Sequence, residues 1–134
     1  MRLILWFTVA VFLAGCGGSP VSPSPVDVQL SLAYGQTVAV GTSGISVRFD
    51  SVVEDSRCPA DAMCVWEGRA VVKVVVSAAR TEVDVSLQSS PGSARAVEVG
   101  GVRVEWIQLE PYPYAGQPTE PGAYRLTLRL TRRG

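Results

Sequence analysis

Apolar and polar residues alternate in several short runs between residues 26 and 130, and this pattern constrains the fold more than any other feature. The alternation is regular in residues 26–32, 45–50 and 124–130. A period of two puts successive side chains on opposite faces of a β-strand, as in a sheet with one buried face. Residues 71–76 are almost all apolar and predict a central strand. No segment has a helical period, so the sequence predicts an all-β fold.

Turn signals divide the pattern into seven or eight short segments. Gly100-Gly101 lies between two alternating runs and predicts a two-residue hairpin. The alternation breaks at Val52-Val53, which predicts a β-bulge, and slips again at Ile107. We therefore expect an antiparallel β-sandwich of about seven to eight strands, Ig-like or similar, with a small barrel as the alternative.

One segment, residues 55–68, does not resemble plain strand or plain turn. Its Cys58 and Cys64 have five residues between them, which is not the spacing of a CxxC redox motif. The chain has no histidine, which argues against a zinc site. A loop closed by a disulfide is the strong interpretation that remains, and Pro59 would stiffen it.

Two roles stay open for this loop. It is either a staple that closes an awkward connection or a rigid recognition loop, in which Arg57, Trp66 and Glu67 are the candidate binding residues. Trp66 follows Cys64 by two residues, so in an extended chain both side chains would point to one face. On that basis we expect the indole to pack over the bridge.

The same segment resembles a motif of small uncharacterised bacterial lipoproteins and secreted proteins, D-S-R-C-P followed by C-x-W-x-G and a Val-rich strand. The matching residues are Asp55, Ser56, Arg57, Cys58, Pro59, Cys64, Trp66 and Gly68. Family members usually carry a small residue where this chain has Glu67. The resemblance covers most of residues 36–78 and implies a secreted β-rich domain, without an established activity.

The first sixteen residues have the features of a targeting segment. Arg2 precedes an apolar run, residues 3–13, that is too short for a membrane span. The run ends in Leu-Ala-Gly-Cys16, which resembles the bacterial lipobox. This resemblance implies a diacylglycerol on the Cys16 thiol, cleavage before Cys16 and acylation of the new amino terminus, which together anchor a protein stably. An ordinary secretory signal with a chance cysteine is the alternative.

Lipidation of Cys16 would leave Cys58 and Cys64 as a pair in a compartment that permits oxidation. Residues 17–25 are rich in Gly, Ser and Pro, without charge, and predict a tether. We therefore expect a signal peptide at 1–15, a lipidated cysteine and tether at 16–25, and one domain at 26–134. The expected location is the bacterial cell envelope, at the outer membrane facing the periplasm if the cell is Gram-negative.

A second unusual segment, residues 111–122, contains two tyrosines and four prolines, and the prolines exclude a central strand. Tyr112 and Tyr114 on a stiff backbone resemble the residues of binding loops and are further candidate binding residues. The alternative is that both rings fold back and cap the open end of the sandwich.

Charge and composition narrow the function. Without Arg2 the chain has eleven basic and twelve acidic residues, so its net charge gives no case for a nucleic-acid partner or for anionic lipid. The lack of histidine excludes Ser-His and Cys-His nucleophile pairs. A calcium site from Glu54, Asp55 and Asp61 is conceivable, but its spacing matches no calcium loop. We expect no cofactor and no metal.

These observations lead to a lipid-anchored, extracytoplasmic β-sandwich without enzymatic activity, acting as a binding or envelope-structural module. Its expected partners are the membrane, through Cys16, and an envelope protein. One alternative is an inhibitor or receptor-like lipoprotein that inserts a loop into a protein partner. Another is a small hydrolase that uses carboxylates such as Glu54, Asp55, Asp61 and Glu67.

Overall fold

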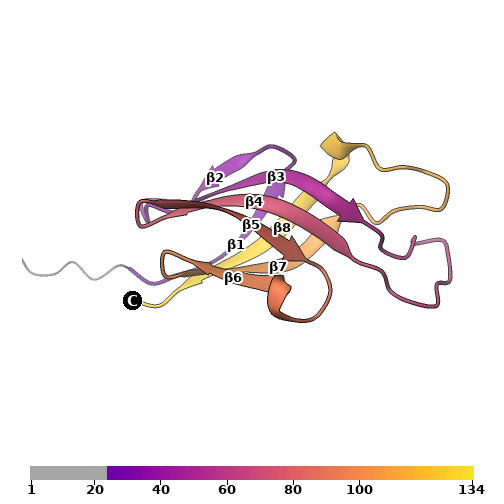
Figure 1. Cartoon of the computed structure of the whole chain (residues 1–134). Coiled ribbons are helices and arrows are strands. Elements are labelled where there is room, and N and C mark those ends of the chain that lie inside the picture. Colours follow the sequence, from indigo (N-terminus) through magenta and orange to yellow (C-terminus); the bar gives the residue numbers. More distant parts are fainter. Residues whose placement is uncertain (1–23) are drawn as a thin grey trace, which may run out of the picture.

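The computed structural model describes residues 24–134, which form two four-stranded antiparallel sheets packed face to face (Figure 1). The first sheet has the order β1 (Val26–Ala33), β8 (Arg125–Arg132), β7 (Val102–Glu110) and β6 (Ala96–Val99). The second has the order β2 (Thr37–Ala39), β3 (Ser46–Asp55), β4 (Ala70–Ala78) and β5 (Thr81–Gln88). Two short 3-10 turns, η1 (Ser93–Arg95) and η2 (Pro121–Ala123), complete the elements. The predicted sandwich is confirmed.

The alternating apolar side chains meet between the two sheets. Leu126, Leu128 and Leu130 of β8 are fully buried, and the polar residues between them face outward or sit at intermediate depth. β4 lies inside its sheet between β3 and β5 and buries Val74, Val75 and Val76 in succession, as its apolar run predicts. Each such side chain contributes roughly 1.5 to 3 kcal/mol to the stability of the fold.

The predicted turn and irregularities also occur. Val99 pairs with Val102, so Gly100 and Gly101 form a two-residue hairpin with φ of 56° and 76°. A type I′ turn needs this left-handed conformation at both positions, which glycine adopts without strain. Register shifts lie between Val52 and Glu54, where the bulge was predicted, and between Trp106 and Gln108.

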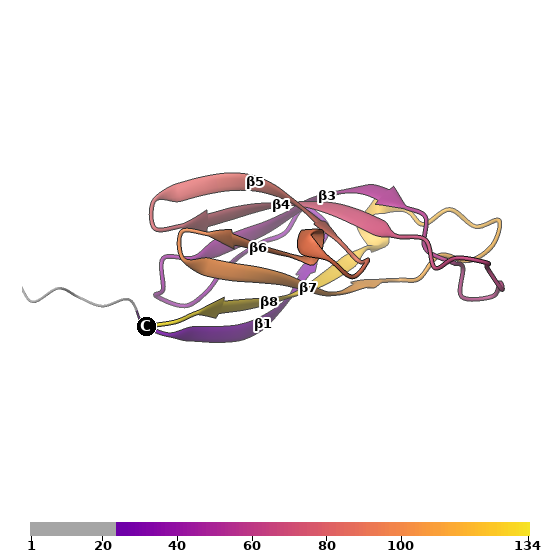
Figure 2. The ribbon, with the colours of Figure 1, turned by 60° about the horizontal axis from the view of Figure 1, so that its bottom comes forward.

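The long loops gather at one end of the sandwich, as both views show (Figures 1 and 2). This distal end carries the β3–β4 loop, residues 56–69, and the β7–β8 loop, residues 111–124. β1 starts and β8 finishes at the opposite, proximal end, next to the β4–β5 and β6–β7 hairpins. The chain therefore enters the domain at the end farthest from its two unusual segments.

The predicted signal peptide and Cys16 lie outside the described residues, and the domain boundaries stay a prediction. Within residues 24–134, no helix is long and apolar enough to cross a membrane.

Candidate binding site

The β3–β4 loop is closed by the predicted disulfide between Cys58 and Cys64, whose Cα atoms are 5.9 Å apart. Two backbone hydrogen bonds tighten its neck: Ser56 N donates to the Arg69 carbonyl at 2.7 Å, and Cys58 N to the Glu67 carbonyl at 2.9 Å. Gly68 completes the neck with a φ of +65°, and a Cβ there would overlap the Ser56 carbonyl oxygen. The loop is thus fixed at its base independently of its tip.

Arg57 is the buried centre of the distal end. It is only 7% exposed, and its guanidinium makes two 2.7 Å contacts with the Asp55 carboxylate. It also donates to the carbonyls of Leu109 at 2.6 Å and Pro111 at 2.9 Å. The Tyr112 ring lies 4.4 Å from the guanidinium carbon, in cation–π geometry. One side chain therefore joins the β3–β4 loop to the β7–β8 loop.

This position bears on the prediction that Arg57 is a binding residue. Its ion pair with Asp55 is buried. As a candidate binding residue Arg57 has little free hydrogen-bonding capacity, since its guanidinium is taken up by Asp55 and two carbonyls. Arg57 is engaged in this way because the carbonyls of Leu109 and Pro111, more than fifty positions away in sequence, lie beside it. No local sequence pattern predicts these contacts.

Asp55 connects Arg57 to the core. Burial alone raises the pKa of Asp55, but the hydrogen bonds from Arg57 and Tyr124, together with the guanidinium charge, bring it below the usual range. Tyr124 donates its hydroxyl to Asp55 at 2.9 Å. Burial and this negative neighbour raise the pKa of Tyr124, so the phenol stays protonated and keeps donating. Asp55 is consequently a charged, fully engaged structural group.

Two further contacts bind the tips of the loops together. Ala60 N donates to the Pro113 carbonyl at 2.9 Å, and Ala115 N donates to the Asp61 carboxylate at 2.8 Å. The disulfide loop and the Pro/Tyr loop are therefore one structural unit. Their juxtaposition could not be predicted from the sequence, which showed only that both were unusual.

The tip of the disulfide loop is apolar and open to solvent. Trp66 is 74% exposed, Val65 is 93% exposed and Met63 is fully exposed. Tyr112 and Tyr114 of the neighbouring loop are each about half exposed, so neither ring is buried as a cap over the core. These five side chains make up what we call the distal face.

The expectation that Trp66 packs over the disulfide is wrong. It assumed an extended chain, in which residues two apart share a face. Residues 56–69 instead run through turns and bends without strand pairing of their own. The indole is consequently exposed to solvent. Of the two roles that the sequence left open for this loop, its exposure favours the recognition role.

Glu67 lies beside an open hollow of about 300 Å³ at the base of the loop. Its other lining side chains are Arg57, Cys58, Ser89, Ser90 and Tyr112, with Gly68 at the edge. Glu67 is exposed and supplies the only carboxylate of this hollow. Four of the five candidate binding residues are thus accessible. The fifth, Arg57, is buried and joins the two loops that carry the other four.

Three of the carboxylates considered for calcium or hydrolysis are engaged by other groups. Glu54 pairs with Arg69 at 3.1 Å, and the hydrogen bond from Arg69 lowers the pKa of Glu54. Asp55 is engaged by Arg57, and Asp61 accepts from Ala115. In the part of the chain that the structure describes, no group of three Cys, Asp or Glu side chains is placed to hold a metal ion.

Comparison of the chain with protein-family models, with curated proteins and with solved structures finds no match. The resemblance to small bacterial lipoproteins stays a prediction, and the site itself must indicate the function.

Proposed function

We propose that this chain is a lipid-anchored, non-enzymatic binding module of the bacterial envelope that contacts a protein partner through its distal face. The observation that carries this proposal is the exposure of Met63, Val65 and Trp66 on a loop that is fixed by a disulfide and a buried arginine. Large apolar side chains that serve only the fold are buried in the core, whereas several exposed ones gathered on one segment indicate an interaction site.

Rigidity makes the distal face suited to binding. A partner that docks on a preformed loop avoids much of the ordering cost that flexible loops add to association. The disulfide, the Arg57 contacts and the two cross-loop hydrogen bonds all restrict the loop before a partner arrives. Trp and Tyr are also the residue types most enriched at the energetic centres of interfaces.

Lipid anchoring is consistent with the direction of the chain. β1 starts at the proximal end, and Ser24, eight residues after Cys16, precedes it by two residues. An extended tether of that length would span about 25 Å at roughly 3.1 Å per residue. The distal face would then point away from the membrane, where another envelope protein can reach it.

The carboxylate hydrolase is less well supported. Such a site needs two carboxylates across a cleft that holds the substrate. Glu67 is the only carboxylate lining the hollow at the distal end, and Glu54 and Asp55 are paired with arginines.

Photo-crosslinking in intact cells tests the binding role. A photoreactive phenylalanine derivative at position 66 should crosslink one discrete protein, and the same group at position 84, on an exposed strand residue, should not. Truncation of a central interface Trp typically weakens binding by about 2 kcal/mol or more, so Trp66→Ala should raise Kd about 30-fold for the crosslinked protein. Equal crosslinking from both positions would contradict a specific distal face.

Anchoring is tested separately. Cys16→Ser should abolish incorporation of labelled palmitate and move the protein out of the membrane fraction. Unchanged labelling in that variant would rule out the lipoprotein assignment.

A further inference from the structure

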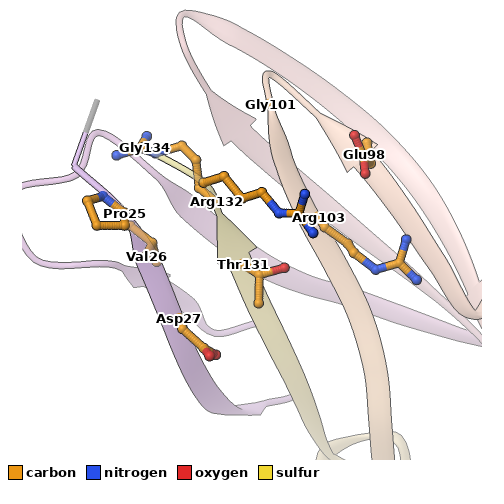
Figure 3. A pocket seen from close by; sticks show the side chains of 10 residues that line it. Pro25, Val26, Asp27, Glu98, Gly101, Arg103, Thr131, Arg132 and Gly134 are labelled. Atoms are coloured by element: carbon orange, nitrogen blue, oxygen red, sulfur yellow. The ribbon is translucent and has the colours of Figure 1, made fainter. Parts of the chain in front are cut away.

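The proximal end carries a second candidate site. An open hollow of about 1220 Å³ lies where the chain enters and leaves the sandwich (Figure 3). Arg103 of β7, Arg132 of β8 and Arg133 line it, together with Asp27 of β1 and Glu98 of β6. Arginine dominates the charged lining, in contrast to the near-neutral balance of the whole chain.

The contacts of these side chains determine how much positive charge stays available. Asp27 is neutralised by Arg129 outside the hollow, with a nitrogen–oxygen distance of 2.8 Å. Arg132 donates to the carbonyl of Ser24 at 2.9 Å and to that of Ser43 at 3.4 Å, both of which leave its charge uncompensated.

Glu98 is the remaining side-chain carboxylate of the hollow, whose lining also includes the backbone of Gly134. It sits opposite Arg103 in the β6–β7 register, yet among the described residues neither Arg103 nor Arg133 has a carboxylate within ion-pair distance. The hollow is therefore lined by three arginines and by one carboxylate side chain outside an ion pair, Glu98. The Arg132 guanidinium is turned to the carbonyls of Ser24 and Ser43, and Arg103 and Arg133 supply the positive charge that stays available in the hollow.

Arg132 also ties this hollow to the predicted tether. Its two hydrogen bonds to Ser24 hold the first described residue against the end of β8. Ser24 therefore lies beside the hollow, next to its lining residue Pro25. Any membrane that holds the anchor lies within tether reach of Arg103 and Arg133.

We propose that the proximal hollow binds the phosphate groups of anionic phospholipids in the membrane that carries the anchor. The planar fork of arginine matches phosphate oxygens, and a tether raises the local concentration of headgroups at the hollow. This inference rests on the proposed anchoring for its physiological setting. Its consequence is an upright domain, with the distal face directed away from the bilayer.

The charge of the opposite end supports the same orientation. The distal end carries the exposed carboxylates of Glu67, Glu110 and Glu120, of which Glu110 is the last residue of β7. Of its basic side chains, Arg57 and Arg69 are paired with acidic neighbours, and Arg125 lies opposite Glu110 in the β7–β8 register. An anionic surface would repel this end and attract the proximal one. The opposite charges of the two ends cancel in the net charge of the chain, so the composition alone does not indicate binding to anionic lipid.

A vesicle-binding measurement tests the site without anchor or partner. A chain starting at Ser24 contains both sheets and the whole described core, and so is a folded unit. It should sediment with phosphatidylglycerol-containing vesicles at low salt, and much less with pure phosphatidylcholine or at high salt. Each arginine near an anionic surface contributes about fivefold in affinity. Arg103→Gln combined with Arg133→Gln should thus weaken partitioning by about tenfold or more.

A matched control removes the same charge elsewhere. Arg69→Gln combined with Arg125→Gln changes the net charge equally at the distal end and should alter partitioning less than about twofold. Equal losses from both pairs would overturn the proposal, as would wild-type protein that ignores phosphatidylglycerol vesicles. Binding of inorganic phosphate without vesicle binding would also overturn it.

Orientation is the second readout. On a supported bilayer with anionic lipid, neutron reflectometry of the anchored wild-type chain should give a thicker protein layer than the Arg103→Gln/Arg133→Gln variant gives. If vesicle binding fails while palmitate labelling and crosslinking from position 66 succeed, the lipid site falls and the binding module stands.

Discussion

Replacement of Arg57 by methionine should destabilise the domain more than any comparable surface change. The substitution preserves much of the side-chain volume but leaves the Asp55 carboxylate, 8% exposed, without its counter-charge. It also leaves the carbonyls of Leu109 and Pro111 without their side-chain donor. Removal of one partner of a buried pair typically costs about 3 to 5 kcal/mol.

That magnitude is large for a domain of this size. Small domains unfold with a total free energy of about 5 to 15 kcal/mol, and each kcal/mol shifts Tm by roughly 4 °C near one hundred residues. Arg57→Met should therefore lower Tm by roughly 12 to 20 °C in a calorimetric or circular-dichroism melt at neutral pH. Chemical denaturation with urea would give the free energy directly.

Arg69→Met is the matched control. Arg69 belongs to the same loop and pairs with Glu54 at 3.1 Å, but the two side chains are 50% and 40% exposed. An exposed pair contributes about 0 to 1 kcal/mol. If Arg57→Met and Arg69→Met have the same small effect, the buried arginine does not organise the distal end.

Lowering the pH should reduce the difference in the free energy of unfolding between wild type and Arg57→Met. The pKa of Asp55 is lowered in the folded protein, so its ion pair stabilises above the ordinary carboxylate range, near pH 3.9. That contribution is lost as the pH falls through the lowered folded pKa. In the variant, protonation instead relieves an unpaired buried charge. If the difference in unfolding free energy stays constant from pH 7 to strong acid, the charge of Asp55 does not stabilise the fold through Arg57.

Three further outcomes are expected. Trp66→Ala should change the free energy of unfolding by less than about 0.5 kcal/mol, as an exposed side chain does. Trp106→Ala, which empties a core site, should lower it by about 3 to 5 kcal/mol. Equal effects of the two variants in urea melts would contradict the exposure of Trp66. Gly68→Ala should cost about 1 to 3 kcal/mol more than Gly116→Ala, because both have positive φ but only Gly68 lacks room for a Cβ; similar melting points would disprove this crowding. Reduction of the disulfide should lower stability by roughly 2 to 2.5 kcal/mol, which a melt with and without reductant measures, and no change would remove its stabilising role.

The fold followed from local pattern. Period-two alternation, the central run in β4, the Gly100-Gly101 hairpin and the bulge near Val52 are all consequences of short-range geometry, and each appears where it was expected. The pairing of strands into two sheets required only that their apolar faces be buried together. The Cys58–Cys64 bridge followed from cysteine spacing and the absence of histidine.

The distal face depended on long-range contacts and could be predicted only in part. Nothing near Arg57 in sequence indicates that carbonyls of residues 109 and 111 would surround it. The environment of Trp66 differs from the expected one because residues 56–69 form a loop, in which residues two apart need not share a face. One signal could have corrected this: a loop with Met63, Val65 and Trp66 around a single disulfide has more apolar surface than so short a segment can bury.

The proposed binding role requires that the distal loops form one rigid face before a partner binds. Measurement of their backbone mobility tests this requirement most directly. Nitrogen-15 relaxation should give order parameters of about 0.85 for the amides of residues 58–67 and 112–115, as in a rigid backbone. Values below about 0.6 across both loops would mean that the partner must order them on binding, and would contradict a preformed face.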